Sequence, residues 1–337
     1  MELNYMMTVR NLGEQGLLKI FRQYCSEVVG DDAAAMGVTL PNHQMVVTTD
    51  MLIDEVHFSD RTTSPEDVGW RAAAVNLSDL AAMGAKPWGL VMSVGLPSET
   101  EVEWIESVYK GFSQCLRTYD TELVGGDTVR SPIRTLAVTA FGQVPQHQLI
   151  QRHTAQVGDA LVITGQHGLS KAGLEILLNP DLYHDFRDRS GVDQELIQSI
   201  CRYHQRPIPR FDAIAMLHQI LQETLKQDPF TVSGMDSSDG LADAIAQICR
   251  ASHVGVDLDW QALPIPEVVK TLAGDRALDW VLYGGEDFEL VLCMPFKLAN
   301  QFIKQLPTAI IIGEITSEIS KNNQLHKLEI RSTFQHF

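Results

Sequence analysis

Hydrophobic residues recur with two different periods along this chain, and both periods appear in its first and second halves. Short runs rich in Val, Ile and Thr are typical of strands, whereas apolar residues three or four positions apart are typical of helices. Strands are predicted at Gln44–Thr49 with a continuation over Met51–Phe58, and at Gly89–Gly95, Glu122–Asp127, Arg134–Gly142, Ala160–Gly165, Val254–Leu258, Phe288–Met294 and Ala309–Ile315. Helices are predicted at Gly16–Tyr24, from Ser64 past Asp79, from Ser98 to Tyr119, from Leu169 onward, and at Asp193–His204, Arg210–Lys226, Leu241–Arg250 and Pro266–Leu272.

This alternation of strands and helices predicts an α/β fold in which each half forms its own layered, α+β-like unit. A chain of 337 residues is long for a single core, so two domains are expected. The polar stretch Pro145–Leu149 has no periodicity and marks the boundary. We therefore predict an N-terminal domain over residues 1–148 and a C-terminal domain over residues 149–337.

The helix that passes Asp79 has clear start and stop signals. Ser64 and Pro65 suit its first turn, and Gly84 suits a left-handed residue at its end. Asn76 and Asp79 lie three residues apart, so both side chains are expected on one face of the helix. A second start signal, the capping box Ser98-Glu99-Thr100-Glu101, is predicted to open the following helix.

Charge and cysteine content narrow the class of protein. The net charge of −17 argues against nucleic acid and anionic membrane as partners. The sequence shows no secretory signal, and no apolar run approaches the ~20 residues of a membrane span. The five cysteines are odd in number and widely spaced, which favours buried thiols in a reducing cytoplasm over disulfides or zinc ligands.

Single acids beside Gly, Ser or Thr recur at predicted strand ends and helix starts. They are Asp32, Asp50, Asp127, Asp236 and Asp239. Each alone is explained by a turn or a helix cap, because short acidic side chains favour both. Together with Asp79 they form a set that would repel itself without cations. Thr48 and Thr49 add hydroxyl and carbonyl oxygens next to Asp50, and such hard ligands suit magnesium. The set therefore predicts a magnesium–phosphate site.

Several nucleotide and hydrolase motifs are absent from the sequence. There is no Gly-x-x-x-x-Gly-Lys-Ser/Thr loop, no Gly-x-Gly-x-x-Gly, no His-Arg-Asp, no Gly-x-Ser-x-Gly and no His-Glu-x-x-His. Any nucleotide is therefore expected to be held by metal ions and backbone amides instead of a P-loop lysine.

Six short motifs occur in an order that resembles the thiamine-monophosphate kinase family. They are Gly30-Asp31-Asp32-Ala33, Thr48-Thr49-Asp50 with His57-Phe58, Asn76-Leu77-Ser78-Asp79-Leu80-Ala81-Ala82-Met83-Gly84, Gly125-Gly126-Asp127-Thr128, Asp236-Ser237-Ser238-Asp239-Gly240-Leu241 and Gly284-Gly285-Glu286-Asp287-Phe288-Glu289-Leu290. They span residues 30 to 290, and the ordered set is specific although each motif is short. The resemblance implies the two-domain PurM-like architecture, with a homodimer formed through the N-terminal sheet.

The resemblance also implies an activity and its residues. The expected reaction is ATP-dependent phosphorylation of thiamine monophosphate to thiamine diphosphate, assisted by several magnesium ions. The implied metal ligands are Asp32, Thr48, Thr49, Asp50, Asp79, Asp127, Asp236 and Asp239, of which Asp50, Asp79 and Asp127 are the implied catalytic residues. The implied ATP contacts are Tyr109, Gly126, Asp127, Arg152 and Ser238, and the implied thiamine-phosphate contacts are His57, Glu286 and Phe334. Phe334 is included because the tail has no Trp, which the family usually places against its substrate.

Local interpretations of these contacts stay open beside the implied ones. His57 also fits a surface histidine, Glu286 a turn acid, Arg152 a solvated loop and Tyr109 ordinary helix packing. Two other functions remain as alternatives: another PurM-like ATP-dependent synthetase, and a non-catalytic, metal-stabilised dimeric binding protein. For the kinase reaction no general base is required, because the second pKa of a phosphate ester is about 6 and the nucleophile is already ionised at neutral pH.

Overall fold

The computed structural model describes residues 34–36, 40–181, 194–224 and 231–318, which form two five-stranded sheets with helices packed on them. The first sheet has the strand order β1-β2-β5-β3-β4. Its strands are β1 (Ala34–Met36), β2 (His43–Ile53), β3 (Lys86–Leu96), β4 (Leu123–Arg130) and β5 (Thr135–Pro145). Adjacent strands are antiparallel except for β3 and β4, which are parallel.

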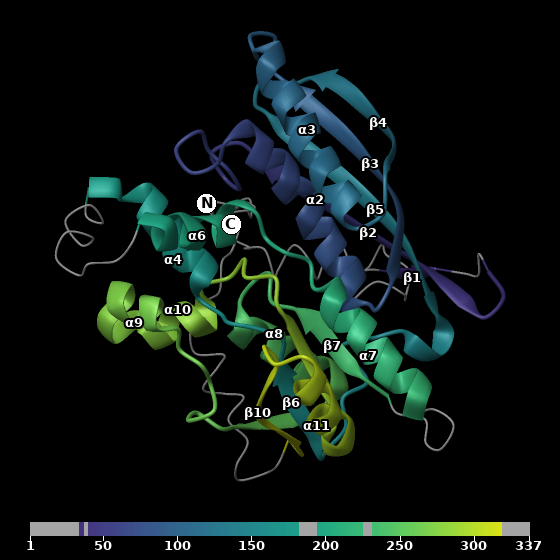
Figure 1. The fold of residues 1–337 in the computed structure, drawn as a ribbon. Coiled ribbons are helices and arrows are strands. Elements are labelled where there is room, and N and C mark those ends of the chain that lie inside the picture. Colours follow the sequence, from purple (N-terminus) through teal and green to yellow (C-terminus); the bar gives the residue numbers. More distant parts are fainter. Residues whose placement is uncertain (1–33, 37–39, 182–193, 225–230, 319–337) are drawn as a thin grey trace, which may run out of the picture.

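Two helices cover one face of the first sheet, α2 (Pro65–Ala82) and α3 (Val102–Thr118) (Figure 1). Burial alternates along the central strand β5, where Leu136, Val138 and Ala140 are buried beneath these helices. The residues between them point to the opposite, outer face of the sheet, because successive side chains of a strand alternate in direction. This alternation decides which candidate site residues can meet.

The second sheet has the strand order β7-β9-β6-β10-β8, and all its pairings are antiparallel. Its strands are β6 (Asp159–Ile163), β7 (Ser233–Asp236), β8 (Gly255–Leu258), β9 (Leu290–Pro295) and β10 (Ile310–Thr316). The described helices of this half are α4 (Leu169–Leu178), α6 (Gln194–Gln205), α7 (Phe211–Thr224), α8 (Leu241–Ser252), α9 (Glu267–Ala273), α10 (Ala277–Tyr283) and α11 (Phe296–Gln305). A 3-10 turn at Gln146–Gln148 precedes this half, and another lies within it at Gly274–Arg276.

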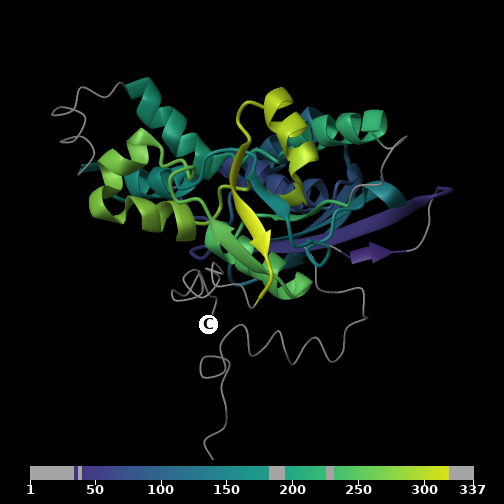
Figure 2. The ribbon, with the colours of Figure 1, turned by 90° about the horizontal axis from the view of Figure 1, so that it is seen from below.

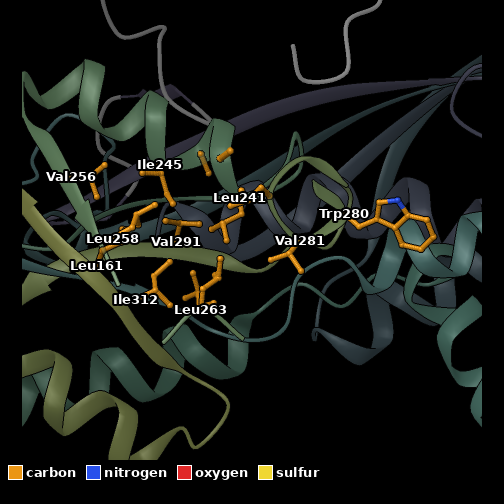
Figure 3. Packing of buried hydrophobic residues seen from close by; sticks show 14 of the residues in the cluster. Leu161, Leu241, Ile245, Val256, Leu258, Leu263, Trp280, Val281, Val291 and Ile312 are labelled. Carbon is orange, nitrogen blue, oxygen red and sulfur yellow. The ribbon is translucent and has the colours of Figure 1, made fainter. Parts of the chain in front are cut away.

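The second sheet is buried on both faces, as β6 shows. Leu161 packs in a core with α8, α9 and α10, whereas its neighbour Val162 packs in a core with α7 and α11. Figure 3 shows the first of these cores, where Leu161, Val291 and Ile312 of the sheet lie near Leu241 and Ile245 of α8. Figure 2 shows the helices and sheets from below. Double-sided burial explains why this strand is an uninterrupted apolar run in the sequence.

Helix α2 connects the two halves. Ala81 and Ala82, near its C-terminus, belong to the same core as α7, β6 and β9. Met83 accepts a hydrogen bond from the Ile150 backbone N–H (3.2 Å), at the start of the second half. Gly84 follows with φ +71° and terminates the helix, as predicted. The small side chains allow the second half to approach the helix closely.

The structure confirms the layered α/β class and corrects several details. The capping box at Ser98–Glu101 is wrong, because the Ser98 hydroxyl donates to the neighbouring Glu99 side chain and Glu101 caps α3 without a side-chain hydrogen bond. Strand β2 ends at Ile53 instead of continuing to Phe58, and β4 continues to Arg130. Helices α10 and α11 were not predicted. The predicted helix Gly16–Tyr24 lies outside the described residues.

The observed strand bounds also correct the expectation that the site acids lie at strand ends. Asp50 and Asp127 lie inside β2 and β4, whereas Asp236 is the last residue of β7. Among the described helices, none combines the length and apolar character that a membrane span requires.

Candidate active site

The motif on α2 contacts strand β2 through two polar pairs. The Thr48 hydroxyl donates a short hydrogen bond to Asp79. One turn earlier on the helix, the Asn76 side-chain oxygen accepts from the Asp50 backbone N–H (3.1 Å). Asn76 is fully buried, and its amide nitrogen donates to the Ala72 carbonyl of its own helix (3.1 Å). These pairs bring Thr48, Asp50 and Asp79 to one place between the sheet and the helix.

The second half contributes Asp236 to the same place. The Ser78 hydroxyl of α2 donates to one Asp236 oxygen (2.6 Å), and the Ser238 hydroxyl donates to the other (2.9 Å). Asp236 is fully buried at the end of β7. We call Asp50, Asp79 and Asp236 the carboxylate cluster.

Electrostatics within the carboxylate cluster favour protonation or a cation. Burial and, to a lesser extent, the Asp236 charge raise the pKa of Asp50 to about 6, although a hydrogen bond with Asp79 lowers it. Burial also raises the pKa of Asp236, against the hydrogen bonds from Ser78 and Ser238 and the charge of Arg152. A hydrogen bond between two carboxyl groups requires a shared proton. A divalent cation can take the place of that proton, because it neutralises the same charge.

The donor set of this cluster consists of carboxylate and hydroxyl oxygens, which fit magnesium. Within the described residues, no three His, Cys, Asp or Glu side chains are arranged as a ready metal-holding group. The side chains instead hold one another through hydroxyl and carboxyl hydrogen bonds. The residues therefore fit the cation in chemistry, and Asp50 and Asp79 contact each other through a carboxyl–carboxyl hydrogen bond.

The predicted ATP contacts Arg152 and Ser238 lie beside the carboxylate cluster. Arg152 donates to the Gln247 side chain of α8, and its charge acts on Asp236. Ser238 bonds Asp236 through its hydroxyl, and its backbone carbonyl accepts from the Glu286 N–H (2.7 Å). Asp239 is exposed in the following turn.

Asp127 lies on the opposite face of the first sheet from Asp50. The strand register places Asp127 beside Ser93, Ala137 and Met51, which form a row on the outer face. The row of Asp50 runs instead through Val138 and Met92 to Gly126, three strand spacings away. That separation is about 14 Å between the backbones of Asp50 and Gly126. The structure therefore does not bring Asp127 to the carboxylate cluster of its own chain.

Thr49 also faces the outer side of the first sheet. Its hydroxyl donates to the Val138 carbonyl (2.8 Å) and accepts from the Thr139 hydroxyl (3.1 Å). The Thr49 side chain therefore bonds to β5 on the outer face, whereas the Thr48 side chain bonds to Asp79.

Glu286 lies in the loop before β9 and contacts both α2 and α6. One of its oxygens accepts from the Arg71 guanidinium, and the other lies 3.4 Å from His204 Nδ1. Burial would raise the pKa of Glu286, but the Arg71 charge and the His204 contact lower it well below its ordinary value. Glu286 is therefore ionised at all physiological pH values.

The neighbouring acid in this motif has a different role. Asp287 accepts from the backbone N–H groups of Gly168 (2.7 Å) and Ser170 (2.8 Å), at the start of α4. Burial raises the pKa of Asp287 to about 7, against these two hydrogen bonds. These contacts attach the loop that carries Glu286 to the start of α4.

The remaining predicted residues lie apart or outside the described chain. His57 accepts from the Ile53 backbone N–H (3.1 Å) in the turn after β2. Tyr109 packs on the core under α3. Asp32 and Phe334 lie outside the described residues.

Sequence reasoning missed three residues that organise the site, namely Arg71, Ser78 and His204. A signal existed for the first, because Arg71 interrupts an apolar, alanine-rich helical stretch where a charge needs a partner. Ser78 lay inside a recognised motif, but nothing local indicated Asp236 as its acceptor.

A separate cavity lies at the end of α2, away from the residues of the carboxylate cluster. Its volume is about 490 Å³, and its walls include Gly84, Lys86, Tyr119, Phe211 and His218. No residue of the carboxylate cluster lines it.

Comparison with known proteins agrees with these features. A family profile described as "AIR synthase related protein, N-terminal domain" matches residues 30–144. A Synechococcus elongatus protein named thiamine-monophosphate kinase is 44% identical over 338 residues, covering 98% of each chain. A Prochlorococcus marinus protein of the same name is 33% identical over 341 residues, covering 100% of this chain and 99% of the other. A solved structure described as AaThiL complexed with AMPPCP and TMP is similar with a TM-score of 0.83 and 27% identity, covering 99% of this chain and 100% of that one.

Proposed function

The chain belongs to the thiamine-monophosphate kinase family and phosphorylates thiamine monophosphate with ATP, and we propose that the carboxylate cluster is where the phosphoryl group is transferred. The product is thiamine diphosphate, so the enzyme is a transferase of thiamine biosynthesis. The observation that supports the location is the convergence of Asp50, Asp79 and Asp236 from both halves of the chain. ATP is the co-substrate, in line with the ATP analogue AMPPCP in the similar structure.

Magnesium binding is part of this proposal. The ligands proposed from the family resemblance are Asp32, Thr48, Thr49, Asp50, Asp79, Asp127, Asp236 and Asp239. Thr48 is engaged with Asp79 inside the first half, and Ser78 holds Asp236 from the second half. When bound there, magnesium would supply the positive charge that two polyanionic substrates lack.

The protein's own contribution to the transfer is positioning. The attacking phosphate oxygen of thiamine monophosphate is largely ionised at neutral pH, because its pKa is about 6. No general base is therefore needed, and an in-line transfer depends on alignment and charge. Arg152 and Ser238 are proposed to contact ATP from beside Asp236, and Tyr109 and Gly126 are proposed as further ATP contacts.

The substrate end of the site is proposed to contain Glu286, His57 and Phe334. The Glu286 carboxylate is ionised and its side chain is 37% exposed, so it can accept a hydrogen bond from a ligand. His57 receives a backbone hydrogen bond on Nδ1, which leaves Nε2 to carry its proton. Its ring can therefore donate to a phosphate oxygen.

We further propose a homodimer formed through the outer face of the first sheet. Asp127 lies on that face, far from the Asp50 of its own chain, so a second copy is proposed to receive it. The outer face also exposes Met51 and Val129, which suits a packed interface. The proposed division at residues 148 and 149 places one sheet in each domain.

A reducing, cytoplasmic location completes the proposal. The described cysteines Cys115, Cys201, Cys249 and Cys293 are buried thiols outside any disulfide. Buried thiols of this kind persist in a reducing compartment.

The deciding experiment is mass-spectrometric detection of thiamine diphosphate formed from ATP and thiamine monophosphate by the purified chain. We expect equimolar ADP and thiamine diphosphate, with magnesium required. A related ATP-dependent synthetase would release ADP only with a different acceptor. A non-catalytic binding protein would be stabilised by magnesium without nucleotide turnover. Either result would contradict the proposed function.

A further inference from the structure

Arg71 is a fully buried cation that joins the two halves. Its side chain is 2% exposed, and it lies on α2 two turns before the carboxylate cluster. One guanidinium nitrogen donates to the His204 backbone carbonyl on α6, and another donates to Glu286. A buried ion pair is weak support for stability, because apolar residues of similar size often stabilise as well or better. Stability alone therefore does not explain the buried Arg71–Glu286 pair.

Glu286 is held in a fixed and partly open position. Its backbone has φ +59°, a conformation uncommon for residues other than Gly, Asn or Asp, and its N–H donates to Ser238. Arg71 and His204 contact the carboxylate, while 37% of the side chain stays exposed. A carboxylate offers about four acceptor positions, so two contacts leave others for a ligand. The exposed part is available to a substrate.

His204 completes this arrangement on the α6 side. Because an ionised carboxylate only accepts, the Nδ1 atom facing it must carry the proton. Ser170 Oγ lies 3.3 Å from the same nitrogen. Burial and the Arg71 charge lower the pKa of His204, so the ring is neutral and acts as a hydrogen-bond donor instead of a second cation.

Helix α2 fixes the spacing between this carboxylate and the carboxylate cluster. Arg71 contacts Glu286, and Ser78, seven residues later on the same side of the helix, contacts Asp236. Seven residues of α-helix span about 10 Å and return to the same face. The two loops of the second half are also tied to each other, through the hydrogen bond from Glu286 N–H to the Ser238 carbonyl.

We propose that Arg71 and His204 are positioning residues that hold Glu286 at a set distance from the carboxylate cluster, and that this distance selects an extended substrate. The selected class is a phosphate ester that carries an amino-heterocycle or a cationic ring at its far end. The phosphate reaches the cluster while the far ring reaches Glu286. This inference rests on the proposed function, which places the phosphates at the cluster.

The test compares two substrates with Arg71→Met. Thiamine monophosphate carries both an aminopyrimidine and a thiazolium ring, whereas hydroxyethylthiazole phosphate is shorter and lacks the aminopyrimidine. We expect Arg71→Met to raise KM for thiamine monophosphate at least tenfold, with KM for ATP changed less than threefold. The preference in kcat/KM for the longer substrate should fall by a similar factor.

Two substitutions at His204 distinguish a positioning role from a packing role. His204→Asn keeps an N–H donor close to the position of Nδ1, whereas His204→Leu removes it. We expect His204→Asn to retain KM for thiamine monophosphate within threefold and His204→Leu to raise it several-fold. If Arg71→Met does not fold, this pair decides the question by itself.

Arg206→Met is the matched control. Arg206 lies on the stretch after α6 and also binds α2, through Asp67 and Glu66, away from Glu286. We expect it to lower the melting temperature without raising KM for thiamine monophosphate.

The two proposals fail in different ways. A wild-type chain that makes no thiamine diphosphate contradicts the proposed function. If the wild type is active and folded Arg71→Met keeps the same substrate preference, only the positioning role is contradicted. Where Arg71→Met does not fold, an unchanged substrate preference in His204→Leu contradicts it instead.

Discussion

Asp79 on helix α2 accepts a hydrogen bond from the Thr48 hydroxyl on strand β2, across 31 residues of sequence. This contact joins a helix carboxylate to the strand that carries Asp50. Because Ser78 on the same helix binds Asp236, α2 holds acids from both halves together. The following predictions test that arrangement.

Asp79→Asn is expected to lower kcat by at least about a thousandfold, because a neutral amide cannot supply the charge that magnesium needs. The fold should survive, since the amide oxygen can still accept from Thr48. Turnover measured by mass spectrometry and a thermal melt by circular dichroism check both expectations. Asp275→Asn, at an exposed acid in a 3-10 turn, is the control and should leave both unchanged. Near-normal kcat at saturating magnesium would show that the cluster is not the site.

Asp127 is expected to act in the site of a second copy, because it faces away from Asp50 in its own chain. Asp79→Asn and Asp127→Asn should each be inactive alone. If the proposed homodimer forms, co-expression of the two variants should give mixed dimers in which one site receives an intact set of acids. We expect the mixture to recover about a quarter of wild-type activity, since half of the dimers are mixed and each has one complete site. No recovery would show that Asp127 acts within its own chain or that no dimer forms.

Magnesium affinity is expected to rise with pH, because burial and Asp236 raise the pKa of Asp50 to about 6. A raised carboxyl pKa means that the folded chain holds a proton that the unfolded chain releases above about pH 4. Without magnesium, stability should therefore fall as pH rises from about 4 to 6. Magnesium must displace that proton, so its apparent affinity should rise about tenfold per pH unit below pH 6.

Thermal melts with and without magnesium at pH 5.0, 6.0 and 7.5 measure this linkage. The magnesium-induced rise in melting temperature should be smallest at pH 5.0. Asp50→Asn is the control, and its response to magnesium should be weaker and less dependent on pH than that of the wild type. An equal magnesium effect at all three pH values would refute the linkage.

Local signals in the sequence were sufficient for helix α2 and its motif. Ser64 accepts from the Asp67 N–H at its start, and Gly84 adopts the left-handed conformation at its end. By contrast, the capping box at Ser98 failed, since a side-chain hydrogen bond to the next residue competes with capping.

Contacts between distant segments could not be predicted locally. Arg71 and the His204 carbonyl are 133 residues apart in sequence, and only the packing of α2 against α6 brings them together. The position of Asp127 could not be predicted either, because the face of a strand residue depends on register. A one-residue shift reverses every side chain, and β3 contains such an irregularity between Pro87 and Gly89.

Gly125 and Gly126 offer a final prediction, because they are adjacent in one motif but differ in their surroundings. A Cβ on Gly126 would lie 2.1 Å from the Met92 carbonyl oxygen of the neighbouring strand, a backbone atom that cannot move aside. A Cβ on Gly125 would lie 3.4 Å from a Val91 methyl group, which can adjust. We expect Gly126→Ala to displace β4, to raise KM for ATP at least tenfold and to lower the melting temperature. Gly125→Ala should stay within about 0.5 kcal/mol of wild-type stability, with twofold changes in kinetics at most. Nucleotide titration and thermal melts of the two variants check this contrast. Equal effects of the two substitutions would mean that the close approach of β3 and β4 does not explain why the motif has glycine at position 126.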